Sequence, residues 1–166
     1  MDNVLADVSS QFLRYYGEAT GIYLRKDELI GKGESEAFPD AKLAGRFVFQ
    51  PGFFRSVPIM EGSRDVVRQL NERYEVFIVS AAMEFPNSFV EKYDWLAEHF
   101  PFISWQQIVF CGSKRIIKAD YLIDDYPKNL DFFEGEKLLF TAPHNQLLTG
   151  YKRLNNWQEV SDLLLG

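Results

Sequence analysis

The sequence predicts an α/β protein in which a parallel sheet carries helices on both faces and a small helical cap is inserted near the start. From Pro58 onward, short apolar runs alternate with segments of helical periodicity. Residues 19–56, by contrast, are broken repeatedly by Gly and Pro, which favours short helices between turns. A chain of 166 residues is most often one domain, or a core with a small insertion. We therefore expect a core of residues 1–7 and 58–166 and a helical cap over residues 8–57.

The elements follow from these patterns in order. Residues 9–18 predict a helix, with Ser9 or Ser10 as its N-cap. The core helices, where apolar residues recur at helical spacing, are expected at 61–74, 88–100 and 157–165. The core strands, which are short apolar runs, are expected at 75–80, 108–111, 121–123 and 137–141. Because strands alternate with helices, the connections are crossovers and the strands are parallel.

Composition and charge exclude several classes of protein. The chain is 46% hydrophobic and 16% aromatic, which excludes a disordered protein. Its net charge of −6, with no basic run to offset it, argues against binding to a nucleic acid polymer. An anionic substrate then requires a metal ion or a few well-placed cations. The lone Cys111 fits a reducing cytoplasm, and no signal peptide or membrane-spanning apolar run of about 18 residues is visible.

Candidate site residues stand at strand ends, where open parallel sheets bind ligands. Asp124 and Asp125 follow a buried strand, and two adjacent carboxylates favour a hard cation such as Mg²⁺. The same pair also suits a helix N-cap, because Pro127 follows at once. Ser80 ends another strand, where its hydroxyl is suited either to a phosphate oxygen or to an ordinary turn. Lys114 follows a Gly-containing turn and offers a cation to a phosphoryl group, or is a solvated lysine.

Three further features have ordinary structural readings. Phe53 and Phe54 could stack on a base, although such a pair more often belongs to the core. His144 has no Ser or Cys nucleophile motif beside it, so a structural or loop histidine is the better interpretation. Residues 31–34 lack the spacing and the preceding strand of a phosphate-binding loop.

The order of Asp2, Ser80, Lys114 and the pair Asp124-Asp125 is that of motifs one to four in the haloacid-dehalogenase superfamily. Within it, the chain resembles the 5'(3')-deoxyribonucleotidases over nearly its full length. Residues 1–7 are similar to that family's Asp-Met-Asp-Gly-Val-Leu-Ala-Asp. The other matching segments are 77–80, 91–95, 122–125, 139–141 and 144–145.

The resemblance implies a Rossmann-type core with a cap that closes over a nucleoside. It also implies a Mg²⁺-dependent phosphatase in which an Asp nucleophile forms an aspartyl-phosphate. Asp2 maps to the acid/base, and its carbonyl would help to hold Mg²⁺. The remaining roles are metal binding for Asp124 and Asp125, phosphate binding for Ser80 and Lys114, and substrate contact for Phe53, Phe54 and Ala81.

The chain departs from the family pattern at several positions. The nucleophile falls one residue before Met1, so we expect the chain as written to be inactive or nearly so, and to bind Mg²⁺ more weakly than a complete relative. Asn3 stands in place of Gly, and Ala81 stands where a second hydroxyl is expected. Residues 31–36 match poorly. These departures leave the base preference open.

The leading hypothesis is a phosphomonoesterase that hydrolyses deoxynucleoside monophosphates with Mg²⁺. The alternatives are a non-catalytic relative that binds phosphate or nucleotide, and a phosphatase of the same fold for another small phosphomonoester. The expected partner is a small nucleoside monophosphate, and we expect binding to neither a nucleic acid polymer nor a membrane. The sequence leaves open whether the protein forms a homodimer.

Overall fold

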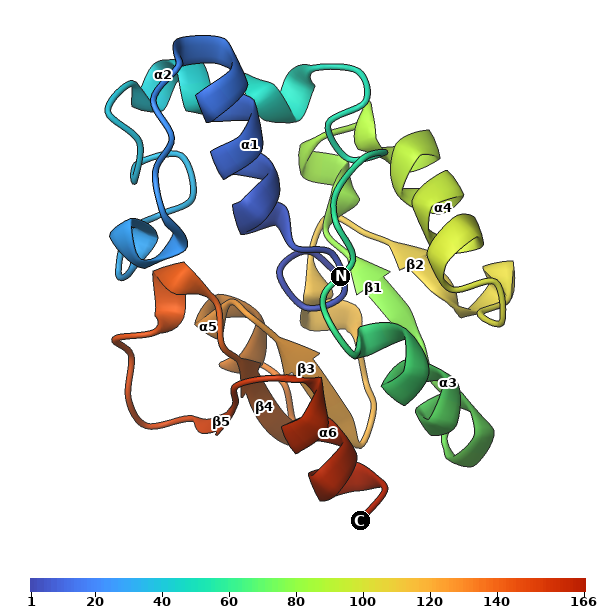
Figure 1. The fold of residues 1–166 in the computed structure, drawn as a ribbon. Helices are drawn as coiled ribbons and strands as arrows, with labels where there is room; N and C mark the ends of the chain where they lie inside the picture. The colour runs from blue at the N-terminus through green and yellow to red at the C-terminus, as the bar shows by residue number, and fades with distance from the viewer.

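The computed structural model describes residues 1–166 and confirms the α/β class (Figure 1). The strands are β1 (Ile78–Ser80), β2 (Ile108–Phe110), β3 (Tyr121–Asp124), β4 (Glu136–Phe140) and β5 (Lys152–Leu154). The helices are α1 (Val8–Thr20), α2 (Ala41–Ala44), α3 (Ser63–Arg73), α4 (Ser88–His99), α5 (Pro127–Leu130) and α6 (Trp157–Leu164). Every strand pairing is parallel, as the alternation of strands and helices predicts.

The strands form two sheets, β1-β2 and β3-β4-β5, where the sequence predicted one. β1 and β3 are each paired on one side only, so the two sheets are not hydrogen-bonded to each other. Residues 1–6 bridge their carboxyl ends. The Met1 amine lies 3.5 Å from the carbonyl oxygen of Val79 in β1, and the Asn3 amide lies 3.3 Å from the Asp125 carboxylate just after β3. The first residues of the chain therefore lie where the two sheets approach each other.

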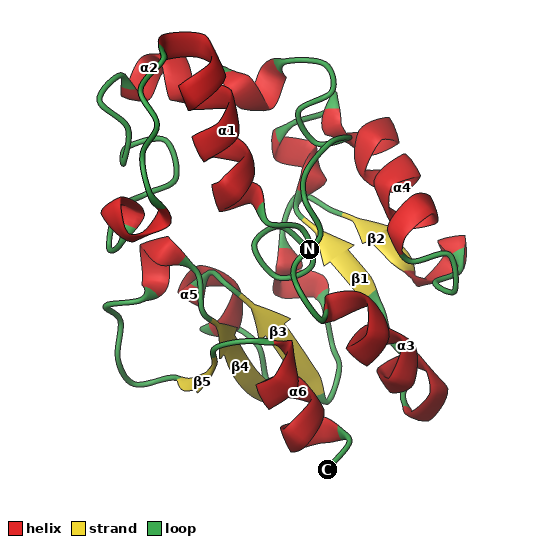
Figure 2. Cartoon of the chain, viewed as in Figure 1, coloured by secondary structure: helices red, strands yellow, loops and turns green.

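Residues 8–57 hold helices and turns and no strand (Figure 2). α1 rises from the carboxyl ends of the strands, and the segment up to residue 57 passes above it before returning to the core (Figure 1). In the core, α3 and α6 pack against each other, and α5 packs against β3 and β4. Residues 8–57 are called the cap. That they form a separate unit stays a prediction.

Two local predictions were wrong, and one strand was missed. The N-cap of α1 is Asp7 rather than Ser9 or Ser10, because its carboxylate accepts bonds from the Ser10 amide at 3.1 Å and hydroxyl at 2.7 Å. β1 begins at Ile78 rather than at residue 75, and Phe77 before it is 47% exposed. β5 was missed because two of its three residues are charged, which hides the apolar pattern of a strand.

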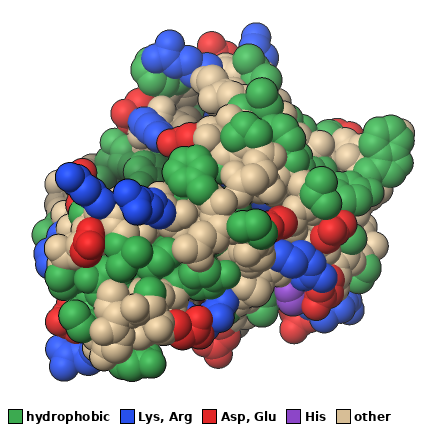
Figure 3. All heavy atoms as spheres, turned by 90° about the horizontal axis from the view of Figure 1, so that it is seen from above, with side chains coloured by type: hydrophobic (Ala, Val, Ile, Leu, Met, Phe, Trp, Pro, Cys, Tyr) green, Lys and Arg blue, Asp and Glu red, His purple; other side chains and the backbone are tan.

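A single large apolar cluster joins the cap to the core. Its fully buried side chains include Phe47 and Phe53 from the cap and Trp95, Phe100 and Leu138 from the core. On the face seen from the cap side, Lys and Arg are scattered among acidic and hydrophobic side chains (Figure 3). None of the helices combines the length and the apolar character that crossing a bilayer requires.

Candidate active site

Five polar side chains from separate parts of the sequence meet at the carboxyl ends of β1 and β3. We call them the edge cluster: Asp2, Ser80, Lys92, Lys114 and Asp124. Lys92 bonds to Asp2 and Ser80, Lys114 bonds to Asp124, and Lys114 and Asp2 are close enough for each charge to affect the other's pKa. Ser80 and Asp124 are the last residues of β1 and β3, so the parallel arrangement directs both to the same edge. Four of the five were candidates from the sequence, and the structure brings those four together.

Lys92 is the member that sequence reasoning missed. It lies in α4, is 2% exposed, and its ammonium donates to the Asp2 carboxylate at 2.6 Å and to the Ser80 hydroxyl at 3.2 Å. Its spacing from Trp95 and Leu96 gave a usable signal, because residues three and four apart share one helix face and both neighbours are apolar. Burial acts to raise the pKa of Asp2, but the charges of Lys92 and of the N-terminal amine outweigh it, and the pKa lies below its ordinary value.

Lys114 and Asp124 form the second ion pair of the cluster. Their side chains are 9% and 1% exposed, and the ammonium lies 2.5 Å from one carboxylate oxygen. The other oxygen accepts bonds from the Tyr126 amide and the Asn129 side chain, both at 2.9 Å. Burial opposes both charged forms, but each partner stabilises the other's charge, so the pKa of Asp124 is lowered and that of Lys114 is raised. Asp124 is thus held as a carboxylate.

A second group of side chains lies beside the edge cluster. Atoms of Glu34, Asp125 and His144 that could bind a metal all lie within 4.8 Å of one another. Burial, together with the charges of Asp124 and Glu34, raises the pKa of Asp125 to about 8. Burial, together with the charge of Asp2, raises the pKa of Glu34 to about 7.

His144 is fixed against this group by its Nε2–H, which donates to the Asp125 carbonyl at 3.0 Å, and its ring stacks on Tyr126 at 4.2 Å. Burial lowers the pKa of His144, which favours the neutral ring. His144 therefore contacts a site residue, which the structural reading of the sequence did not anticipate. Glu34 also escaped notice, because it lies in a loop without periodicity.

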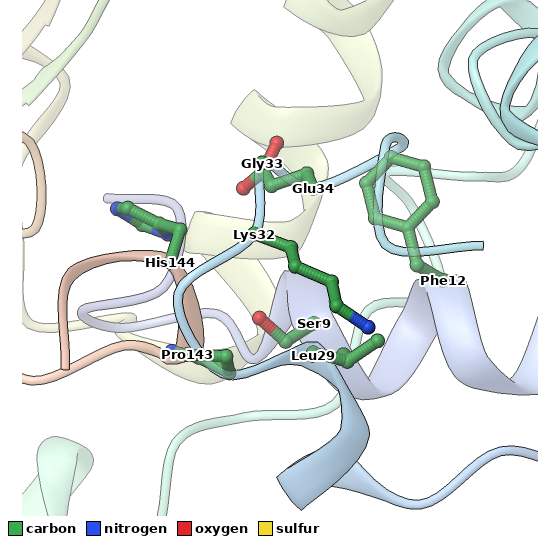
Figure 4. A pocket seen from close by; sticks show the side chains of 8 residues that line it. All are labelled: Ser9, Phe12, Leu29, Lys32, Gly33, Glu34, Pro143 and His144. Carbon is green, nitrogen blue, oxygen red and sulfur yellow. The ribbon is translucent and has the colours of Figure 1, made fainter. Parts of the chain in front are cut away.

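The hollow that the cap and the core share beside His144 is small. Pro143 and His144 from the core and Lys32 and Glu34 from the cap line a hollow of about 10 Å³, with the Glu34 carboxylate pointing toward the His144 side (Figure 4). That is barely room for one water molecule, whereas ligand pockets measure about 300–1,000 Å³. In this structure the cap lies closed over this part of the site.

The three residues predicted to contact substrate have different surroundings in the structure. Phe53 is fully buried against Phe12, Tyr15 and Phe54, which is the core position that the sequence favoured, and no face of its ring is open to a base in this structure. Its contact with substrate stays a prediction. Phe54 is 4% exposed and carries the Lys92 ammonium 4.4 Å from its ring centroid, so it supports the edge cluster. Ala81 follows Ser80 at the end of β1 and is half-buried.

The donor set suits a divalent cation with hard oxygen ligands. Asp124 and Asp125 are adjacent and buried, and one ammonium, that of Lys114, pairs with only one of them. The second carboxylate has Asn3 and the neutral His144 as neighbours. A cation between these carboxylates would relieve their repulsion, so the residues fit the Mg²⁺ site predicted from the sequence.

Comparison with known proteins agrees with this arrangement. A model of the family described as 5' nucleotidase, deoxy (pyrimidine), cytosolic type C protein matches residues 1–166. A 5'(3')-deoxyribonucleotidase of Bacillus subtilis is 37% identical over 165 residues, which cover 99% of this chain and 95% of that protein. A Staphylococcus epidermidis protein that carries the same enzyme name in provisional form is 42% identical over 163 residues, covering 98% of this chain and 91% of its own length. The resemblance first seen in the motifs is thereby confirmed, and the chain belongs to the 5' nucleotidase, deoxy (pyrimidine), cytosolic type C family.

Proposed function

We propose that the protein is a Mg²⁺-dependent phosphatase that hydrolyses deoxynucleoside monophosphates at the edge cluster. One observation carries the proposal: two buried ammonium groups, Lys92 and Lys114, meet two carboxylates at the carboxyl ends of β1 and β3. Such a preorganised array of charges is suited to phosphoryl transfer, in which positioning and charge stabilisation supply most of the catalysis.

In this proposal the chain's own residues divide the work. Lys92, Lys114 and the Ser80 hydroxyl bind the phosphoryl oxygens. Asp2, one third exposed and hydrogen-bonded to Lys92, takes the acid/base role: after taking up a proton from solvent it donates that proton to the leaving alkoxide, and as the carboxylate it later accepts one from the attacking water. Asp124 and Asp125, with the Asp2 carbonyl, would hold Mg²⁺, which when bound offsets negative charge on the phosphoryl oxygens.

We propose that the nucleophile is a carboxylate on a residue directly before Met1, because Asp2, Asp7 and Asp124 are already bonded to other groups. Asp2 and Asp124 are bound to lysines. Asp7 is engaged as the N-cap of α1 and accepts further bonds from Lys26 at 2.8 and 3.0 Å. A residue placed before Met1 would lie close to Val79, between the ends of β1 and β3.

The test is phosphate release from a panel of 5'- and 3'-deoxynucleoside monophosphates, their ribose counterparts and small sugar phosphates. The enzyme is the chain extended before Met1 by an apolar strand that ends in Asp. We expect Mg²⁺-dependent turnover with deoxynucleotides preferred, lost in Asp124→Asn. Asp120→Asn is the matched control, because Asp120 is an exposed acid just before the first residue of the same strand. Faster turnover of sugar phosphates than of any nucleotide would contradict the proposed substrate.

A further inference from the structure

We propose that Asn3 and Glu34 form a latch between the cap and the edge cluster, and that the latch must open before an anionic substrate reaches the site. This inference rests on the proposed function, because it takes the substrate to carry a phosphate. The contact joins residues 31 positions apart: the Asn3 Nδ2 donates to the Glu34 Oε1 at 2.6 Å.

Asn3 is built to hold this position. It is 1% exposed, and its Oδ1 accepts bonds from the amide and the hydroxyl of Ser9, both at 3.0 Å, in the first turn of α1. Its Nδ2 also lies 3.3 Å from the Asp125 carboxylate. Both the oxygen and the nitrogen of the side-chain amide therefore have partners. The nitrogen contacts Glu34 in the cap and Asp125 in the site at the same time.

The backbone at Asn3 has a conformation that glycine would adopt without a side chain. Asn3 has φ of 50°, and it is the one residue other than glycine with a positive φ. Asn tolerates this left-handed conformation better than most residues, and Gly accepts it freely. The family pattern has Gly here, which has no side chain to offer. The cap partner lies in residues 31–36, the segment that matches the family poorly.

Charge and space explain why the latch would control access. Glu34 takes part in none of the ion pairs of the structure, and its carboxylate lies beside that of Asp125. When it is ionised, it therefore places negative charge at the edge that a phosphate must approach. The hollow that Glu34 lines lies beside the edge cluster, on the His144 side, and has about 10 Å³, so the cap leaves no room for a substrate group there. With the latch closed, the Glu34 carboxylate fills the space beside Asp125, and its ionised form is electrostatically unfavourable to an anion there.

Amide hydrogen exchange tests the latch itself. Asn3→Gly removes the donor while the backbone conformation is kept, and Glu34→Ala removes the acceptor. We expect both variants to raise exchange in residues 31–36 by about tenfold, the effect of losing one charge-assisted hydrogen bond. Glu36→Gln is the matched control, because Glu36 is an exposed acid in the same loop, and its exchange should stay at the wild-type value. Unchanged exchange in both latch variants would overturn the proposal.

Calorimetric titration with inorganic phosphate, in the presence of Mg²⁺, tests the control of access. When only a fraction of the molecules have an open site, the apparent affinity for a ligand falls in proportion to that fraction. Asn3→Gly and Glu34→Ala should therefore bind phosphate several-fold more tightly than wild type. Glu34→Gln removes the charge while an acceptor remains, and it too should bind more tightly. Glu36→Gln should match wild type.

Weaker or equal phosphate binding in the Glu34 variants would overturn the claim that the latch restricts access. Failure of the proposed function gives a different pattern: no form binds phosphate or releases it from nucleotides. If exchange still rises in the two latch variants, the contact stands as a latch, but its role in substrate access is overturned with the function. If exchange does not rise either, both are overturned.

Discussion

Replacing Lys92 with Met should destabilise the protein by about 2–3 kcal/mol. The substitution keeps the length of the side chain and removes the ammonium, which is bonded to Asp2 at 2.6 Å and to Ser80 at 3.2 Å and lies over the Phe54 ring. Removing one partner of a fully buried ion pair costs about 3–5 kcal/mol, and a hydrogen bond to a charged group contributes about 1.5–3. The Asp2 side chain is 34% exposed, so water solvates part of the orphaned charge and the lower range applies.

Urea unfolding of four forms measures this effect and its origin: wild type, Lys92→Met, Asp2→Asn and the double variant. We expect Lys92→Met to cost little once Asp2 is already neutral, which gives a coupling energy of about 1.5–3 kcal/mol. Lys118→Met, at an exposed lysine without an ion pair, is the control and should change stability by less than about 0.5 kcal/mol. A loss below that value for Lys92→Met, or the same loss with and without Asp2, would refute the reasoning.

Three further predictions rest on the same contacts and on the packing around one glycine. Burial and the charge of Asp124 raise the pKa of Asp125 in the folded state from its ordinary value of 3.8 to about 8. Between these two pH values the folded protein keeps a proton on Asp125 that the unfolded chain has lost. The metal-free protein should therefore lose stability as the pH rises from about 5 to about 8, and Asp125→Asn should flatten this slope in urea unfolding. An equal slope in both forms would show that Asp125 titrates normally. In calorimetry, Asp124→Ala should abolish Mg²⁺ binding and Asp120→Ala should preserve it; full-strength binding by Asp124→Ala would remove that residue from the metal site. A Cβ at Gly135 would lie 2.4 and 2.5 Å from two backbone carbonyl oxygens, so Gly135→Ala should lower stability by about 2 kcal/mol or more in thermal unfolding. Gly112→Ala, whose nearest neighbour is 3.9 Å away, should cost little, and equal losses would argue against a steric cause.

The sequence predicted those site residues that a regular element places. Ser80 and Asp124 end parallel strands, and parallel strands bring their carboxyl ends to one edge, so their meeting follows from the alternation of elements. Lys92 was within reach of the same reasoning, because helical spacing puts it on the buried face of α4.

Loop residues and strand neighbours were harder to predict. Glu34 comes from a Gly-rich loop with no periodicity, and its contact with Asn3 depends on how the cap lies on the core. The same limit applies to Phe53, whose aromatic character suits a core as well as a ligand. The division into two sheets also has no local signal, because the pattern of a short apolar strand indicates that it is buried but not which strand it pairs with.

The most direct test of the account compares phosphate release from deoxyuridine 5'-monophosphate by two forms of the protein in the presence of Mg²⁺. One is the chain as printed, and the other carries an apolar strand ending in Asp directly before Met1. The account predicts turnover by the extended form that exceeds the printed chain by about two orders of magnitude or more, because a carboxylate then stands in line with the phosphorus at the edge cluster. Equal turnover by both forms, from preparations free of other phosphatases, would contradict an aspartyl-phosphate formed at that position.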